Sequence, residues 1–178
     1  VYPSTPQDAY GMMLACVEDD NPVMFVENKF LYDTLKGEVD VDAPPIPLGK
    51  ADIKREGKDV TIVATGKMVH ESLRAAEALE KEGMDIEVLD LRSLYPLDKD
   101  TIYASVQKTH RVIVTSEETK RGSYAGEISA LISENIMDEL DAPVKRVCAL
   151  DTPIPFAGAL ESYFLPNADD IIKAVKEL

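Results

Sequence analysis

The pattern of hydrophobic and polar positions is clearest between Asp59 and Leu97, where two apolar runs flank an amphipathic segment. The runs are rich in β-branched residues, as is typical of strands buried on both faces, and comprise Val60, Ile62 and Val63, then Ile86, Val88, Leu89 and Leu91. The segment between them predicts a helix ending at Gly83. Its expected buried stripe is Val69, Leu73, Ala76 and Leu79, and its expected exposed face is Glu71, Arg74, Glu77 and Lys81. Two strands joined through a helix predict a βαβ unit with parallel strands.

The alternation of strand and helix patterns continues after this unit. The expected elements are a helix from Asp98 to about Lys108, a strand over Arg111–Ser116, a helix after Tyr124 that ends near Leu140, a strand over Val144–Ala149, and a helix from about Ala168 to Glu177. Before the unit, Lys50–Lys58 is expected to form an edge strand or hairpin. The chain therefore predicts an α/β fold, with an open, mostly parallel sheet and helices on both faces.

The first 33 residues predict one helix and one strand that have no further partners in the sequence. The helix is expected to begin at about Pro6, with Thr5 as its N-cap, and to end near Asp19 and Asp20. Its apolar stripe is Ala9, Met12, Met13, Cys16 and Val17, and a strand is expected over Val23–Val26. We interpret residues 1–33 as the end of a truncated domain, residues 34–49, rich in proline and acid, as a linker, and residues 50–178 as a second domain.

Charge and composition exclude some classes of partner. The 19 basic and 33 acidic residues give a net charge of −14, which argues against nucleic acid or an anionic membrane and suits a basic partner. Cys16 and Cys148 are too few for a disulfide framework, so we expect a reducing compartment. No apolar run is long enough to cross a bilayer and no signal peptide is recognisable, which predicts a cytoplasmic protein. Because the chain begins at Val1 without an initiator methionine, we expect it to be part of a longer protein.

Candidate binding residues follow the predicted strands, because ligands of open α/β sheets bind beyond the carboxyl ends of the strands. The loops to examine are those after Ala64, Arg92, Ser116 and Ala149. Thr65, Gly66, His70 and Glu71 open the first helix of the βαβ unit, where free amides can hold an anion. A single glycine is neither a dinucleotide nor a phosphate motif, so we favour a plain strand-to-helix turn, with His70 in a packing or capping role.

Charged residues after the predicted strand Arg111–Ser116 offer two further candidates. Glu117 and Glu118 could supply carboxylates for acid/base chemistry or a metal, but adjacent residues in a strand point to opposite faces. We therefore favour solvation or a subunit contact for both. Lys120, Arg121 and Gly122 precede a helix and could attract a phosphate, although a surface loop is favoured. Taken alone, these residues identify no reaction.

Six segments of the chain, in order, resemble one enzyme family. They are PSTPQDAYGMM, DDNPVMFVENKFLY, IPLGKADIKREGKDVTIVATGKMVHESLRAAEALEKEG, EVLDLRSLYPLD, LDAPVKRV and DTPIPFAGALE. Together they resemble the C-terminal half of the β subunit of thiamine diphosphate-dependent 2-oxoacid dehydrogenases, a family that includes the pyruvate, branched-chain 2-oxoacid and acetoin dehydrogenases. Within this resemblance, residues from about Ile46 onward are similar to the transketolase C-terminal domain. Val1 to about Asp33 are similar to the end of a pyrimidine-binding domain.

The resemblance implies an oxidoreductase that decarboxylates a 2-oxo acid with thiamine diphosphate and magnesium and passes the acyl group to a lipoyl arm. It also implies that the activating glutamate and the histidine near the substrate lie upstream of Val1. The α subunit, or a fused α domain, would hold the diphosphate and magnesium. No catalytic or cofactor-binding residue is therefore expected in this chain, whose own role would be subunit assembly, including contact with a second β subunit, and docking.

Two binding sites are implied by position within the family. The main-chain carbonyls of Cys16, Val17, Asp19 and Asn21, in the segment CVEDDN, correspond to a structural potassium site; the alternative is an unoccupied helix C-terminus. Asp141 of the LDAP segment corresponds to a residue that meets a basic side chain of the subunit-binding domain of the dihydrolipoyl acyltransferase. The alternative for Asp141 is a solvated loop acid.

Two other functions stay open on the sequence. The first is another thiamine enzyme of the transketolase group, such as a deoxyxylulose phosphate synthase, against which the DTPIPF and LDAP segments argue. The second is a free-standing α/β module that binds a small anion at its strand ends.

Overall fold

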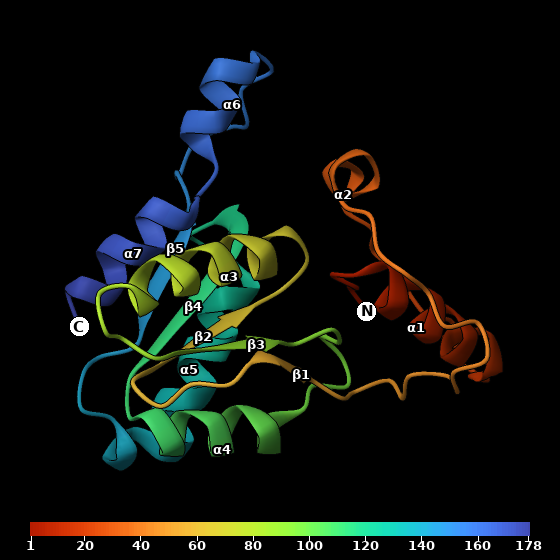
Figure 1. Ribbon diagram of the computed structural model, residues 1–178, viewed down its shortest axis with the longest axis horizontal. Helices are drawn as coiled ribbons and strands as arrows, with labels where there is room; N and C mark the ends of the chain where they lie inside the picture. The colour runs from red at the N-terminus through yellow and green to blue at the C-terminus, as the bar shows by residue number, and fades with distance from the viewer.

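Five strands form one sheet in the order β1-β3-β2-β4-β5 in the computed structural model, which describes all 178 residues (Figure 1). The strands are β1 Asp52–Arg55, β2 Val60–Ala64, β3 Ile86–Asp90, β4 Val112–Thr119 and β5 Lys145–Ala149. β2 pairs in parallel with β3 and β4, and β4 pairs in parallel with β5, whereas β1 lies antiparallel to β3 at the edge. The predicted open, mostly parallel sheet, its βαβ unit and its edge strand are confirmed.

Helices cover both faces of this sheet (Figure 1). On one face lie α3 Lys67–Glu80 and α7 Ala168–Lys176, and on the other lie α4 Lys99–Thr109 and α5 Tyr124–Ile136, which is followed by the 3-10 turn Met137–Glu139. The predicted helices are therefore confirmed to within a few residues at their ends. Local capping agrees with the sequence: Asp98 accepts a hydrogen bond from the Thr101 amide, and Gly83 after α3 has a positive φ of 85°.

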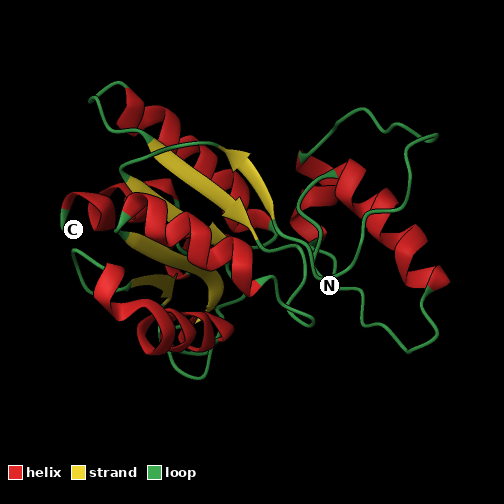
Figure 2. Cartoon of the chain, turned by 90° about the horizontal axis from the view of Figure 1, so that it is seen from below, coloured by secondary structure: helices red, strands yellow, loops and turns green.

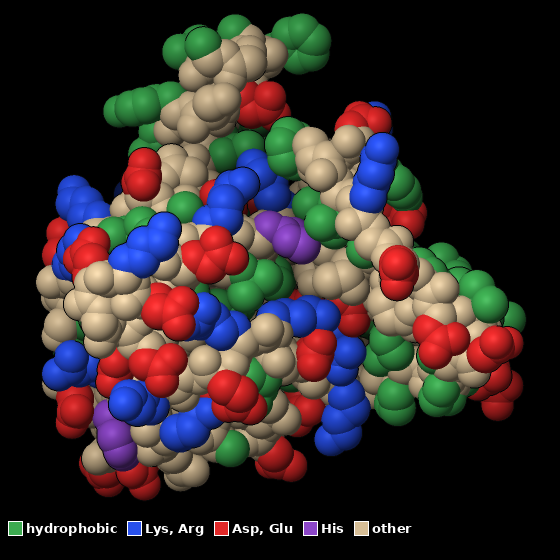
Figure 3. All heavy atoms as spheres, viewed as in Figure 1, with side chains coloured by type: hydrophobic (Ala, Val, Ile, Leu, Met, Phe, Trp, Pro, Cys, Tyr) green, Lys and Arg blue, Asp and Glu red, His purple; other side chains and the backbone are tan.

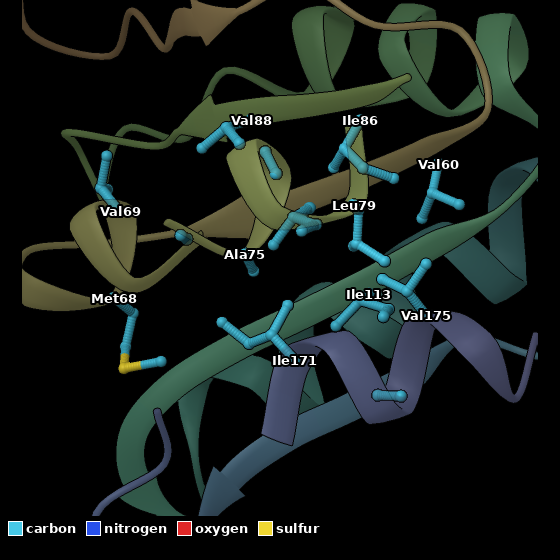
Figure 4. Packing of buried hydrophobic residues seen from close by; sticks show 14 residues of the cluster. Val60, Met68, Val69, Ala75, Leu79, Ile86, Val88, Ile113, Ile171 and Val175 are labelled. Atoms are coloured by element: carbon cyan, nitrogen blue, oxygen red, sulfur yellow. The ribbon is translucent and has the colours of Figure 1, made fainter. Parts of the chain in front are cut away.

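The register of the central strands sorts the core into two layers. Ile62 lies opposite Val88 and Ile113, and all three pack in the cluster beneath α3 and α7, together with Leu79 and Ile171 (Figure 4). The next residues along the three strands, Val63, Leu89 and Val114, pack in the second cluster, beneath α4 and α5. Successive side chains of a strand point to opposite faces, so covering both faces requires the unbroken apolar runs seen in the sequence.

The N-terminal segment, residues 1–34, lies beside the sheet rather than on either face (Figure 2). It carries α1 Pro6–Glu18 and α2 Lys29–Thr34, and no helix or strand follows between Leu35 and Ala51. Thr5 caps α1 as predicted, because its side chain accepts from the Asp8 amide. The apolar stripe of α1 is only partly covered: Met12 is 1% exposed, but Met13 and Val17 are 42% and 77% exposed.

Several predictions of local structure were wrong. Val23–Val26 is extended but is not a strand, because its hydrogen bonds run only to the first residue: Val26 N donates to Val1 O (2.9 Å) and Val1 N donates to Met24 O (2.8 Å). The sequence pattern missed α2 and also α6, Gly158–Phe164. With six and seven residues, these helices are too short to display a hydrophobic period.

Glu71 was also placed wrongly, on the exposed face of α3. It is only 4% exposed, and its Oε2 accepts a hydrogen bond from the Ala168 amide at the start of α7 (3.1 Å). The reason is that α7, which is almost a hundred residues further along the chain, packs across this side of α3.

The arm that carries α6 projects away from the sheet, with hydrophobic side chains on its surface (Figures 1 and 3). Its exposed apolar residues are Ile154, Phe156, Leu160 and Tyr163. None of the helices combines the length and the apolar character that crossing a bilayer requires.

Candidate functional site at the carboxyl edge of the sheet

The sheet topology directs attention to the carboxyl ends of β2 and β4. From β2 the chain moves to β3 on one side of the sheet, and the later strand β4 returns to pair on the other side of β2. In open α/β sheets such a change of direction opens a crevice where ligands bind. The N-terminal segment, which lies beside the sheet in Figure 2, contacts this edge through Tyr2 and Asn28.

A cluster of charged side chains, most of them largely buried, joins the N-terminal segment to this edge, and we call it the edge charge cluster. Its members are Asp8 of α1, Asp52 and Lys54 of β1, Asp90 at the end of β3, and Arg92. Lys54 Nζ lies 2.7 Å from Asp8 Oδ2 and 3.8 Å from Asp90 Oδ2. Arg92 Nη1 lies 3.2 Å from Asp8 Oδ1. Because Asp8 of α1 pairs with both Lys54 and Arg92, the cluster fixes the N-terminal segment on the sheet.

The pKa values of the two most buried carboxylates of the edge charge cluster, Asp90 and Asp8, are shifted in opposite directions. Burial raises the pKa of Asp90 to about 6, although a hydrogen bond from Ser4 Oγ (2.5 Å) and the charge of Lys54 partly oppose the effect of burial. For Asp8, burial acts in the same direction, but hydrogen bonds from Lys54 and Thr5 outweigh it, so the pKa of Asp8 is lowered. Asp90 is therefore the proton-binding member of the pair.

A second contact between the N-terminal segment and the edge centres on Glu117. Its Oε2 accepts hydrogen bonds from Asn28 Nδ2 (2.6 Å) and Tyr2 OH (3.3 Å). Burial raises the pKa of Glu117. Glu118 is directed elsewhere and accepts from the Tyr124 amide at the start of α5 (2.7 Å). The two carboxylates thus accept from different donors, although both line the same cavity. The expectation of solvation or a subunit contact was wrong for Glu117, which makes an internal contact.

The anion hypothesis for the start of α3 finds no support in the structure. Gly66 has a positive φ of 52°, and a Cβ at this position would lie 2.4 Å from the Tyr2 ring, so the ring covers the turn. His70 Nε2 lies 2.7 Å from the carbonyl oxygen of Ser4, which agrees with the packing role favoured for it. In the loop before α5, Arg121 pairs with Asp151 (2.8 Å) and is exposed, as favoured from the sequence.

The two sites implied by the resemblance lie on different elements. Cys16 and Val17 are in the last turn of α1, Asp19 is its C-cap, and Asn21 follows. No N–H or O–H group of the chain donates to the carbonyl oxygens of these four residues, and the Asp19 side chain accepts from the Asn21 amide (2.8 Å). Asp141 is exposed in the turn before β5, where its N–H donates to His110 O (2.9 Å).

The edge charge cluster is the feature that sequence reasoning missed. One signal was available: Asp90 falls inside the run IEVLDLR, which was itself predicted to be buried on both faces. A buried carboxylate requires a cation or hydrogen-bond donors. The pattern does not say that Lys54 and Ser4 supply them.

Comparison with known proteins supports the family resemblance found in the sequence. A family model described as the transketolase C-terminal domain matches residues 49–171. The chain is 48% identical to the 2-oxoisovalerate dehydrogenase subunit beta of Bacillus subtilis, over 100% of this chain and 55% of that protein. It is 51% identical to the subunit beta of acetoin:2,6-dichlorophenolindophenol oxidoreductase of the same organism, over 100% of this chain and 52% of that protein.

A solved structure shares the fold. It is described as a split gene transketolase in an inactive beta4 tetramer, and it superposes with a TM-score of 0.77 at 29% sequence identity, over 98% of this chain and 55% of that one. The chain therefore spans about half the length of the curated relatives that it matches. The family match over most of the chain, together with the shared fold, shows that this chain belongs to the transketolase C-terminal domain family.

Proposed function

We propose that this chain is the C-terminal half of the β subunit of a thiamine diphosphate-dependent 2-oxoacid dehydrogenase, in which it serves assembly and docking. The observation that carries the proposal is the identity of 48% to the 2-oxoisovalerate dehydrogenase subunit beta across 100% of the chain. The whole enzyme would oxidatively decarboxylate a 2-oxo acid and transfer the acyl group to a lipoyl arm, in the cytoplasm. Its further partners would be an α subunit or fused α domain and a second β subunit.

The surface of the N-terminal segment supports an assembly role. The exposed side chains of Met13 and Val17 continue the apolar stripe of α1, and such a face is normally covered by another element. The side chains of this chain form no group of three or more His, Cys, Asp or Glu residues that could hold a metal ion, and the three aspartates of the edge charge cluster surround Lys54, so they do not fit a magnesium diphosphate site. We therefore derive no catalytic step through that cofactor.

The alternatives receive less support. The split gene transketolase is 29% identical to this chain, against 48% and 51% for the dehydrogenase and oxidoreductase subunits, which favours the dehydrogenase family over the transketolase group. Against a free-standing anion-binding module, two basic residues of the carboxyl edge, Lys54 and Arg92, are paired with carboxylates. A third, Lys67, lies over the Phe30 ring, 4.8 Å from its centroid.

A chimeric subunit tests the proposal. This chain should replace the matched residues of the 2-oxoisovalerate dehydrogenase subunit beta and be expressed with that enzyme's α subunit. We expect the chimera to co-purify with the α subunit and to support 2-oxoisovalerate-dependent reduction of dichlorophenolindophenol within about tenfold of the parent rate, a difference of about 1.4 kcal/mol in activation free energy. The 178-residue chain alone, given thiamine diphosphate and magnesium, should release no carbon dioxide. A folded chimera that does not bind the α subunit, or a chain active alone, would show the proposal to be wrong.

We propose that the carbonyl oxygens of Cys16, Val17, Asp19 and Asn21 bind a structural potassium ion. Carbonyl oxygens suit a hard cation, and these four accept no hydrogen bond within the chain. Because a ligand that binds only the folded state stabilises it, the chimera should melt at a higher temperature in potassium chloride than in lithium chloride of equal ionic strength. Equal melting temperatures in the two salts would contradict the site.

We propose that Asp141 docks against a basic side chain of the acyltransferase subunit-binding domain. Its carboxylate is exposed and forms no hydrogen bond or ion pair within the chain. Asp141→Lys in the chimera should weaken binding of that domain about tenfold, measured by calorimetry at low salt. Asp138→Lys, an equal charge change at an exposed neighbour, is the matched control. Equal losses in the two variants would mean that only overall charge matters and that Asp141 has no specific role.

A further inference from the structure

A cavity of about 270 Å³ lies at the carboxyl edge, between the ends of β2 and β4, where the strand order changes direction. Ala64 and Val114 of these strands line it, together with Tyr124 and Ala125 of α5. Ile154, on the segment before α6, also lines the cavity and is 69% exposed. The cavity is therefore in the position where open α/β sheets bind ligands.

The lining of this cavity is mostly apolar, and its charged groups have one sign. The only ionisable side chains on it besides tyrosines are Glu117 and Glu118. No Lys, Arg or His side chain reaches it. A carboxylate or phosphate placed there would lose its hydration without gaining a cation. An anionic ligand, including a 2-oxo acid, is thus disfavoured.

Glu117 has unused capacity to accept hydrogen bonds at this site. Both of its hydrogen bonds within the chain, from Asn28 and Tyr2, go to Oε2, and none goes to Oε1. An ionised carboxylate can accept at both oxygens. Charge-assisted hydrogen bonds from an ammonium group are among the stronger ones that proteins form. Glu117, which has one carboxylate oxygen without a hydrogen bond, thus lines this cavity together with the apolar side chains of Leu91 and Ile128, and it also lines a neighbouring pocket with Lys67.

We propose that this cavity binds a small primary amine with a branched apolar body. The ammonium group donates to Glu117, and the alkyl part lies among Leu91, Val114 and Ile128. Since Glu117 also holds Tyr2 and Asn28, the amine would bind beside the contact that fixes the N-terminal segment on the sheet. The inference concerns the geometry of this chain and does not depend on the function proposed above.

Three probes of nearly equal shape and different charge test the proposal: isopentylamine, isopentanol and isovalerate. Each should be titrated into the full 178-residue chain while backbone amide shifts are followed by nuclear magnetic resonance. We expect saturable binding of isopentylamine, with shifts at Thr65, Ser116 and Tyr124, and at least about tenfold weaker binding of isovalerate. Isopentanol should lie between the two. If isovalerate binds as tightly as the amine, or if no probe saturates, the proposal is overturned.

Two matched pairs of variants locate the site. Ala125→Leu fills the cavity and should abolish binding, whereas Ala130→Leu, an exposed position on the same helix, should leave it unchanged. Ile154→Arg should weaken amine binding about tenfold through repulsion at the cavity lining, whereas Ile154→Glu should not weaken it. Ile154 is largely exposed, so the second pair decides the question even if Ala125→Leu fails to fold. Binding that is unaffected by Ile154→Arg would overturn the proposal.

Discussion

Replacing Lys54 by methionine should lower the free energy of unfolding by about 3 kcal/mol, one of the largest effects that we expect of a single substitution in this chain. The side chains of Asp8 and Asp90 are 4% and 0% exposed, and the Lys54 ammonium lies within 3.8 Å of both carboxylates. Methionine preserves the length and apolar stem of lysine but leaves two buried carboxylates without their nearest cation. Urea denaturation followed by circular dichroism gives the difference in free energy.

Lys58→Met is the matched control for this prediction. Lys58 is exposed and forms no ion pair, so the same substitution there should change stability by less than about 0.5 kcal/mol. The double variant Lys54→Met/Asp8→Asn should recover part of the loss, because it removes one of the uncompensated charges. If Lys54→Met is as stable as Lys58→Met, the edge charge cluster does not hold the N-terminal segment in place.

The difference in free energy of unfolding between the wild type and Asp90→Asn should change, to the disadvantage of the wild type, as the pH rises from about 4 to about 6. Burial raises the pKa of Asp90 from 3.8 to about 6 in the folded state, so the folded chain binds more protons than the unfolded chain in this window. The stabilising contribution of the protonated group is fully present below pH 3.8 and is lost as the pH rises through about 6. A shift of this size corresponds to roughly 3 kcal/mol over the whole window. Denaturant unfolding of both proteins at a series of pH values measures it.

The direction of this dependence distinguishes Asp90 from its neighbour. The pKa of Asp8 is lowered in the folded state. Its contribution to stability is therefore fully present above its unfolded pKa and is lost as the pH falls through its folded pKa. Asp42→Asn, at an exposed position, should show the wild-type pH dependence and serves as the control. Parallel stability curves for the wild type and Asp90→Asn would show that Asp90 does not bind its proton in this range.

The sequence by itself determined the sheet and its family. Strands covered on both faces must be apolar at consecutive positions, so the runs around Ile62 and Val88 identify parallel strands without knowledge of their partners. The helix between them follows from its own period, and Thr5 and Asp98 cap helices through contacts three residues away. All of these signals are local, or are repeated along one element. The motifs that carry the family resemblance are likewise continuous stretches of chain.

The tertiary structure alone decided which polar groups are buried together and which residues line the cavity. Asp90 meets Ser4 and Lys54, Glu87 beneath α4 contacts Ser105 and Lys108, and Glu71 meets the start of α7. These partners come from other elements, and other residues of the same types, such as Asp42 and Lys58, are exposed. The cavity at the strand ends likewise needs β2, β4, α5 and the segment before α6 to be in place. Hydrophobic periodicity records which side of an element is covered, but not which residue covers it. The strand pattern therefore predicted the edge at which the cavity lies, after Ala64 and Ser116, but neither the edge charge cluster nor the residues from other elements that line the cavity.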